Sequence, residues 1–255
     1  MRRTVVLLAA LAALAPSAHA QSFVGPTDDV VVTVGGGGRV APEWDGSSRY
    51  VLSPMPIFGL KFLRSPFTGK PSTDEGFGVA PSIRLISERH FDAASPLAGL
   101  PDVATAFEAG LTVDYTAPWF RAFVTARQGF GGHRGQVFDL GVDGIVRPNT
   151  AVTLTVGPRL SFATSDYTRA YFGVTAADAL ATGLPAHDPS GGLRSWGLAA
   201  GATWDIDERW FVRADASWQR LADDLARSPI VEKAGSRDQF SVGLGVGWRF
   251  ATGWH

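Results

Sequence analysis

A two-residue period in hydropathy constrains the fold of this chain more than any other feature. In the segment QFSVGLGVGWRF, residues 239–250, the even positions are apolar or aromatic and the odd positions are small or polar. Successive side chains of a β-strand point to opposite faces, so this segment predicts a strand with one apolar face and one polar face. The same period recurs at residues 107–115, 120–126, 138–146, 152–162, 196–206 and 210–218. The repetition predicts an all-β protein.

The spacing of these strands predicts an antiparallel up-and-down barrel. Weaker alternation at residues 30–40, 49–63 and 77–87 brings the number of predicted strands to ten. Tight turns at residues 116–119, 147–150 and 205–210 alternate with longer connections, as periplasmic turns and extracellular loops do in outer-membrane barrels. Residues 62–76 could contain a further hairpin, which would raise the number to twelve.

Charged residues on the polar faces decide which face points inward. Burying unpaired charges costs several kcal/mol each, so a dry sandwich core could not hold them, whereas the lumen of a closed barrel supplies water and opposite charges. We therefore predict a closed transmembrane barrel with a polar lumen and an apolar face toward lipid. The alternative is a periplasmic β-sandwich or lipocalin-like barrel with the apolar face as its core. The lumen-facing candidates are Glu108, Asp114, Arg121, Arg127, Asp139, Asp143, Arg159, Arg213, Asp215 and Arg249; Arg84 and Arg147 share the polar faces.

The strand number also limits the width of the lumen. Barrels of about eight strands are filled by side chains and those of about sixteen to eighteen enclose an aqueous pore, so ten to twelve strands predict a narrow lumen. Rows of opposite charges would close it with salt bridges and leave at most a path for water or small ions. Aromatic residues near the predicted strand ends, such as Trp119, Trp210 and Phe250, resemble the interfacial girdles of membrane barrels.

The first 20 residues have the pattern of a cleavable secretory signal peptide. Arg2 and Arg3 precede a short apolar run at residues 5–15, and Ala18-His19-Ala20 is an A-x-A cleavage site. We expect residues 21–255 to form one barrel domain. The chain has no cysteine, which excludes disulfides and thiolate metal ligands, and 23 Lys+Arg against 24 Asp+Glu argue against a nucleic-acid partner.

No motif in the sequence predicts catalysis, a cofactor or a metal site. The segment GGGGRV at residues 35–40 lacks the Lys-Ser/Thr of a phosphate-binding loop and is better explained as glycine at a strand bend. His90, His133 and His187 fall in predicted loops without a local acid/base signature, and we expect them to be exposed to solvent. The acidic pair Asp223-Asp224 is expected to be solvated. We predict a protein that is not an enzyme.

The longest loop contains a predicted short helix. Thr175 is its N-cap, Asp178 is the capping partner three residues later, and Gly183 follows the last turn. We expect this loop to form an ordered lid over the barrel mouth, or alternatively a surface on which a partner docks. The aromatic lid candidates ahead of the helix are Tyr167, Tyr171 and Phe172.

Several strings of residues are similar to one known family. APEWDGSSRY, LAGLPDVATAFEAGL, YFGVTAADALATGLPAHDPSGGL and SPIVEKAGSRDQFSVGLGVGWRF occur in this order and resemble the MipA/OmpV family, the MltA-interacting proteins of the Gram-negative outer membrane. The resemblance implies an outer-membrane barrel in contact with membrane lipid and lipopolysaccharide. Some members are described as scaffolds linking a murein hydrolase to a murein synthase, others as porin-like or adhesive proteins, and no catalytic residues are implied.

Three hypotheses follow for the function. The first is a scaffold of the outer membrane that engages murein-remodelling enzymes, and the second is a narrow porin-like channel for small solutes or ions. The third is an outer-membrane enzyme that modifies lipid or lipopolysaccharide. Phe250 is expected to close the last strand, with the tail ATGWH in the periplasm.

Overall fold

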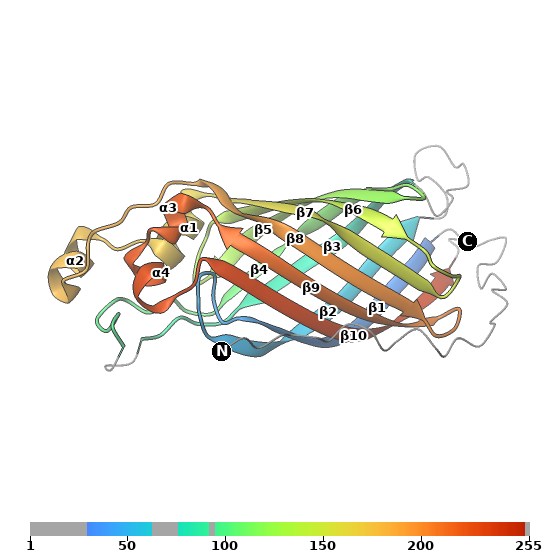
Figure 1. Ribbon diagram of the computed structural model, residues 1–255, viewed down its shortest axis with the longest axis horizontal. Helices are drawn as coiled ribbons and strands as arrows, with labels where there is room; N and C mark the ends of the chain where they lie inside the picture. The colour runs from blue at the N-terminus through green and yellow to red at the C-terminus, as the bar shows by residue number, and fades with distance from the viewer. Residues whose placement is uncertain (1–29, 63–75, 92–94, 253–255) are drawn as a thin grey trace, which may run out of the picture.

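Ten antiparallel strands and four short helices make up the computed structural model, which describes residues 30–62, 76–91 and 95–252 (Figure 1). The predicted signal peptide lies outside these residues. The strands are β1 (Val30–Pro42), β2 (Tyr50–Phe62), β3 (Gly76–Ile86), β4 (Ala106–Thr116), β5 (Phe120–Gly131), β6 (Gln136–Val146), β7 (Val152–Ala163), β8 (Gly192–Asp205), β9 (Trp210–Leu221) and β10 (Asp238–Thr252). The helices are α1 (Ser165–Phe172), α2 (Ala176–Thr182), α3 (Asp223–Ala226) and α4 (Pro229–Ala234).

The strands form a single sheet in the order β2-β1-β10-β9-β8-β7-β6-β5-β4-β3. The first and last strands of the barrel pair along most of their length, from Val30↔Thr252 to Val40↔Val242, and this pairing nearly closes the sheet into a cylinder. The prediction of an up-and-down barrel with ten strands is confirmed. The further hairpin of the twelve-strand alternative would fall on residues 63–75, outside the described residues. β10 runs two residues beyond Phe250, to Thr252.

The apolar face of the sheet points outward. Leu52, Val242 and Leu244 are exposed over 75%, 62% and 60% of their surface, although they belong to regular paired strands. Residues of the opposite parity, such as Gly243 and Gly245, approach side chains inside the barrel. Apolar side chains directed away from the protein need a lipid environment, as in transmembrane barrels. This orientation excludes the sandwich alternative, in which the apolar face would be the core.

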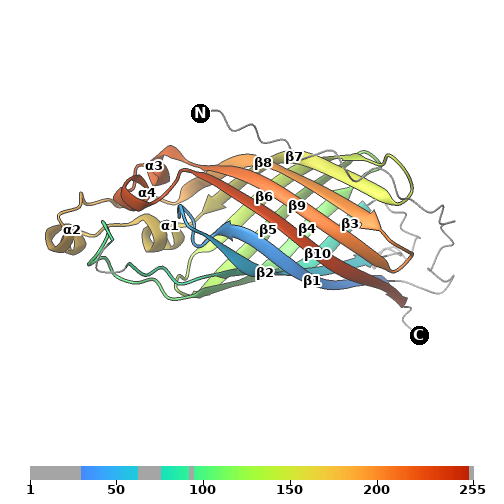
Figure 2. The same ribbon diagram turned by 60° about the horizontal axis from the view of Figure 1, so that its bottom comes forward.

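The two ends of the barrel differ in their connections. Short turns at residues 117–119, 147–151 and 206–209 lie at one end, here the short-turn end, where β1 begins and β10 finishes. All four helices lie at the other end, here the loop end (Figures 1 and 2). None of the helices in the described residues is long and apolar enough to cross a membrane.

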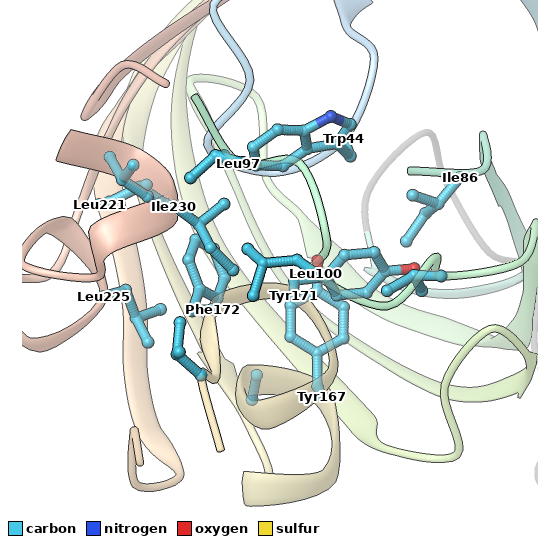
Figure 3. Close-up of a cluster of buried hydrophobic side chains, with 14 of the residues drawn as sticks. Trp44, Ile86, Leu97, Leu100, Tyr167, Tyr171, Phe172, Leu221, Leu225 and Ile230 are labelled. Atoms are coloured by element: carbon cyan, nitrogen blue, oxygen red, sulfur yellow. The ribbon is translucent and has the colours of Figure 1, made fainter. Parts of the chain in front are cut away.

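A compact apolar core fills the loop end and is built from segments far apart in the sequence. We call these segments the cap: residues 43–49, 87–91, 95–105, 132–135, 164–191 and 222–237. Tyr167, Tyr171 and Phe172 of α1 are fully buried against Leu97 and Ile230 (Figure 3). Each large aromatic side chain that is removed from water contributes roughly 1.5–3 kcal/mol. Packing therefore holds α1, and not its N-cap residue Thr164, whose side chain makes no capping hydrogen bond.

Candidate functional site: charged layers inside the barrel

Glu108 is the centre of a buried charge network beneath the cap. The Arg84 guanidinium donates from Nε and Nη2 to the two oxygens of Glu108, at 2.8 and 2.7 Å, and Arg127 Nε donates at 2.9 Å. His133 Nε2 lies 3.3 Å from Glu108 Oε1 but without hydrogen-bond geometry. The Glu108 side chain is fully buried, and its two arginines supply the compensation that a buried carboxylate needs.

The network continues across the barrel from β5 to β8. Arg127 pairs with Asp139, and Asp139 accepts a hydrogen bond from Ser161 Oγ. Arg194 donates from Nε to Ser161 Oγ at 2.8 Å and lies 3.6 Å from Asp139 through Nη2. Six neighbouring strands, β3 to β8, therefore contribute to one connected layer of charges.

Asp45 joins this layer to the cap. It lies on the β1–β2 connection and accepts hydrogen bonds from Arg194 Nη1 and from the Tyr167 hydroxyl of α1. Burial acts to raise the pKa of Asp45, but the positive charges of Arg194 and Arg84 and the Tyr167 hydrogen bond outweigh it and hold that pKa below its usual value. Burial, reinforced by the Asp45 carboxylate, raises the pKa of Tyr167 well above its usual value. Asp45 is therefore an anion that orients α1 over the lumen.

Arg89 fastens α1 from the other side. Its side chain is buried in the cap, and it donates to the Tyr171 carbonyl oxygen at 2.6 Å and to the Pro101 carbonyl oxygen at 3.3 Å. Burial lowers the pKa of Arg89 to about 10. The guanidinium also lies over the rings of Trp44 and Phe91, at 5.9 and 5.4 Å, which compensates part of its desolvation.

Separate ion pairs occupy the half of the lumen nearer the short-turn end. The pairs are Arg121–Asp114 at 3.0 Å, Arg159–Asp143 at 2.6 Å and Arg249–Asp205 at 2.7 Å. Nearer the loop end, Arg39 and Asp215 pair at 3.0 Å between β1 and β9, across the inner face of β10. Arg213 also lies on β9. Among the described residues, it has no ion-pair partner within 4.0 Å.

Apolar side chains fill the space between these pairs. Met55 and Ile57 of β2 and Phe211 of β9 form a small buried cluster. Glycines of β10 make room for it: a Cβ on Gly245 would lie 2.8 Å from Ile57 Cδ1, and one on Gly247 would lie 2.1 Å from Phe211 Cζ. Arg249 lies over the Phe211 ring at 4.3 Å. The small residues of the opening sequence pattern therefore give space to side chains that reach across the lumen.

The lid candidates divide into two groups. Tyr167, Tyr171 and Phe172 lie in α1 and are fully buried in the cap (Figure 3). Thr175 and Asp178 form the expected capping box of α2, in which the Thr175 hydroxyl accepts from the Asp178 N–H at 3.2 Å. However, α2 has no buried residue and projects away from the barrel (Figures 1 and 2), so it does not cover the mouth.

Sequence reasoning missed three members of the charge network. Arg194 is the extra residue of a β-bulge, because Ser161 pairs with Ser195 while Phe162 pairs with Leu193, and the bulge turns Arg194 inward. Asp45 comes from a loop that carries no periodic pattern. The expectation that His133 is exposed was wrong: its ring is buried against Tyr167 and Tyr171, with centroid separations of 4.8 and 5.5 Å.

The remaining motifs give no chemistry of their own. Residues 35–38 of the GGGGRV segment are regular strand residues in β1, paired with both β2 and β10. His90 lies 2.8 Å from Asp102 on the exposed surface of the cap. Among the described residues, no group of three or more His, Asp or Glu side chains has the arrangement of a metal site.

Comparison with known proteins places the chain among outer-membrane proteins. The family model described as MltA-interacting protein MipA matches residues 34–250. The chain is 36% identical over 100 residues to the outer membrane protein Omp26La of Vibrio anguillarum, covering 39% of this chain and 37% of that protein. It is 35% identical over 91 residues to the outer membrane protein OmpV of Vibrio cholerae, covering 36% of this chain and 34% of that protein. The matched segments thus span only about a third of each curated relative.

Two of the solved structures that the chain resembles are an outer membrane protein and a porin. OprG of Pseudomonas aeruginosa is 12% identical with a TM-score of 0.35, covering 91% of this chain and 100% of that chain. The NanC porin is 11% identical with a TM-score of 0.37, covering 86% of this chain and 98% of that chain.

Proposed function

This chain belongs to the family of the MltA-interacting protein MipA, and we propose that it is a non-enzymatic scaffold that holds murein-remodelling enzymes at the inner surface of the outer membrane. It is an outer-membrane β-barrel, and the short turns of such barrels face the periplasm, where murein lies. The family description names an interaction with MltA, a murein enzyme. A murein hydrolase and a murein synthase are therefore the partners that we propose.

The obstructed lumen is the observation that carries this proposal. The Glu108 network and α1 close the loop end, and the cluster of Met55, Ile57 and Phe211 closes the other half. A barrel obstructed twice along its axis is poorly suited to passing solutes, which disfavours the porin-like alternative. Its surfaces are then the parts that remain available for function.

The short-turn end offers an ordered surface for such partners. Asp207 Oδ1 accepts from the N–H groups of Arg209 and Trp210, both at 2.7 Å, and these hydrogen bonds lower the pKa of Asp207. In the neighbouring turn, Asn149 Oδ1 accepts from the N–H groups of Ala151 and Val152 at 2.9 and 2.8 Å. Turns fixed in this way lose little conformational entropy when a partner binds.

Recovery of murein enzymes from cross-linked envelopes tests the proposal. Tagged protein in its own outer membrane is cross-linked, solubilised and purified, and the attached proteins are identified. We expect a murein hydrolase or a murein synthase. Recovery of neither from envelopes that contain both would overturn the scaffold function.

A charge exchange locates the docking surface. Glu208 and Arg209 are exposed on the β8–β9 turn, and Glu232 and Lys233 are exposed on α4 at the loop end. The double variant Glu208→Lys, Arg209→Glu keeps the net charge and should reduce recovery of the enzymes. The matched variant Glu232→Lys, Lys233→Glu should leave recovery unchanged. The opposite result would place the partner at the loop end and contradict periplasmic docking.

A further inference from the structure

The wall of the barrel has a seam between β2 and β3. These strands are the two ends of the sheet order, and they lie alongside each other with Cα atoms within 8 Å. The structure shows no hydrogen-bonded ladder between them among the described residues. Every other neighbouring pair of strands is hydrogen-bonded, so the wall is weakest at this place.

Prolines explain why this seam is unpaired. Pro54 and Pro56 are alternate residues of β2, and the backbone groups of alternate residues point to the same neighbouring strand. The register of β2 with β1 is continuous through both prolines, so the missing N–H donors are those that would face β3. Pro81 removes a donor from β3 in the same way, since the register of β3 with β4 is also continuous.

A proline elsewhere in the barrel shows the same effect on a smaller scale. Pro158 lies in β7, where pairing with β6 stops after Gly141↔Arg159 and resumes at Gly144↔Val156. One proline in an interior strand thus coincides with a short interruption of the ladder. Three prolines on facing edges leave a longer stretch without cross-strand hydrogen bonds.

A cavity of about 820 Å³ lies at the seam and reaches both faces of the wall. On β9 the residues that line it are of inward parity only, namely Ser217, Gln219 and Leu221, whereas on β10 the outward-facing Phe240 also lines it. On β3, every residue from 82 to 86 lines it, whichever face the side chain occupies, and so does Ser87 directly after the strand. On β4 the lining residue is Phe107, which points outward and is 43% exposed. The cavity therefore extends from the lumen to the lipid-facing surface beside β3.

The two ends of this cavity have the chemistry of an amphiphile. Ile83, Leu85 and Phe107 border its outer end and are exposed apolar residues. Its inner end is lined by four arginines and three carboxylates, and Glu108 and Asp215 pair with three of these arginines from outside the lining. Arg39 is the arginine with spare capacity: Nη2 pairs with Asp215, while Nε is buried without a hydrogen-bond partner, and the side chain is 42% exposed.

We propose that the β2–β3 seam is a lateral portal through which an anionic lipid of the outer leaflet places an acyl chain, with its head group near Arg39. The seam at residues 51–56 and 82–87 lies in the loop-end half of the barrel, which is the outer-leaflet half in the orientation of outer-membrane barrels. The acyl chain occupies the gap between the unpaired edges of β2 and β3. The head group accepts a hydrogen bond from Nε of Arg39. This portal is independent of the scaffold function.

Contact quenching by brominated lipids tests the portal. The chain has no cysteine, so single-cysteine variants can be labelled with bimane before refolding into vesicles. The label is placed at Ser53→Cys, inside the wall at the seam, at Leu52→Cys, on the lipid face beside it, and at Thr155→Cys, a lumen position of β7 away from the cavity. Brominated acyl chains should quench position 53 nearly as strongly as position 52 and leave position 155 unquenched. Equal fluorescence at positions 53 and 155 overturns the portal.

A second experiment tests the portal by restoring the backbone N–H donors that the prolines of β2 and β3 lack. The triple variant Pro54→Val, Pro56→Val, Pro81→Val should pair β2 with β3 and bring quenching at position 53 down toward that at position 155. Pro158→Val is the matched control and should leave position 53 quenched. A folded triple variant with unchanged quenching overturns the proposal, and if the triple variant does not fold, the comparison of positions 53 and 155 decides alone.

The head-group assignment is tested with two brominated lipids. Phosphatidylglycerol should quench position 53 more than phosphatidylcholine, and Arg39→Gln should abolish this preference. Arg213→Gln, a lumen arginine outside the cavity, should retain it. Equal quenching by both lipids in the unchanged protein overturns the role of Arg39.

Discussion

Gly247 of β10 and Phe211 of β9 are register partners, and a Cβ on the glycine would lie 2.1 Å from Cζ of the phenylalanine ring. The absence of a side chain on one strand is therefore the condition for a large side chain on its neighbour. Gly245 gives similar room to Ile57 of β2, two strands away across β1. The small residues of β10 allow close packing at the level of the cluster of Met55, Ile57 and Phe211.

Gly247→Ala should destabilise the barrel by about 1–3 kcal/mol, because the added methyl group overlaps the Phe211 ring in a filled lumen. Unfolding in urea from lipid vesicles, followed by tryptophan fluorescence, measures the change. Gly36→Ala on β1, where a Cβ would meet nothing within 4 Å, is the control and should be neutral. Phe211→Leu should restore part of the stability lost in Gly247→Ala, and a Gly247→Ala protein as stable as the Gly36→Ala protein would show that the lumen is not packed.

Asp45 should make the cap sensitive to acid. Its pKa is held below the usual value of about 3.9 in the folded protein, so the unfolded chain binds the proton more tightly than the native state does. The stabilisation is therefore complete above about pH 4 to 5 and is lost as the pH falls through the native pKa. Asp45→Asn should cost about 1–3 kcal/mol at neutral pH and should weaken the acid dependence.

Hydrogen exchange of the α1 amides between pH 3 and pH 7 is the measurement, since Asp45 holds α1 through Tyr167. Asp188→Asn is the control. Asp188 pairs with Arg169, whose hydrogen bond lowers its pKa, but its side chain is 75% exposed and the pair is screened by solvent. If the exchange rates of the α1 amides depend on pH in the same way in Asp45→Asn and in Asp188→Asn, the role assigned to Asp45 is contradicted.

The strands were predictable because their physical cause is local. Lipid on one side and a crowded polar lumen on the other impose opposite chemistry on successive residues, and residues 239–250 display this chemistry directly. The boundaries of β10 shifted by two residues at its end, because pairing with Val30 and Val31 of β1 continues past Phe250. Such pairing depends on residues that are more than 200 positions away and leaves no local pattern.

The charge network was only partly predictable, for the same reason. Glu108, Arg127 and Asp139 follow the strand period, so their inward parity could be read from the sequence. Arg194 breaks the period, because the bulge in β8 that turns it inward depends on the pairing with β7. His133 lies in a short loop, and its burial depends on α1, which begins more than 30 residues later. Loop residues thus become site residues through tertiary packing alone.

The stability of α2 should be independent of the barrel. Thr175→Ala removes the capping box and should cost about 1 kcal/mol of local stability. Gly183 ends the helix at φ 73°, where a residue with a Cβ is strained. Gly183→Ala should therefore cost a similar amount of local stability. Amide exchange within α2 should accelerate in both variants while urea unfolding of the barrel stays unchanged. A fall in barrel stability would contradict this independence.

Two obstructions in series should make the lumen silent in planar bilayers, and removal of either one alone should leave it silent. Met55→Ala with Phe211→Ala opens the half nearer the short turns, but the Glu108 network and α1 still close the loop end. Tyr167→Ala with Tyr171→Ala loosens α1, but the apolar cluster remains in place. Only the fourfold variant combined with Glu108→Ala, which removes the centre of the charge network, should give conductance steps, because current through barriers in series is limited by the higher one. Steps in the unchanged protein would favour the narrow channel, and steps in one double variant alone would show that a single obstruction closes the barrel.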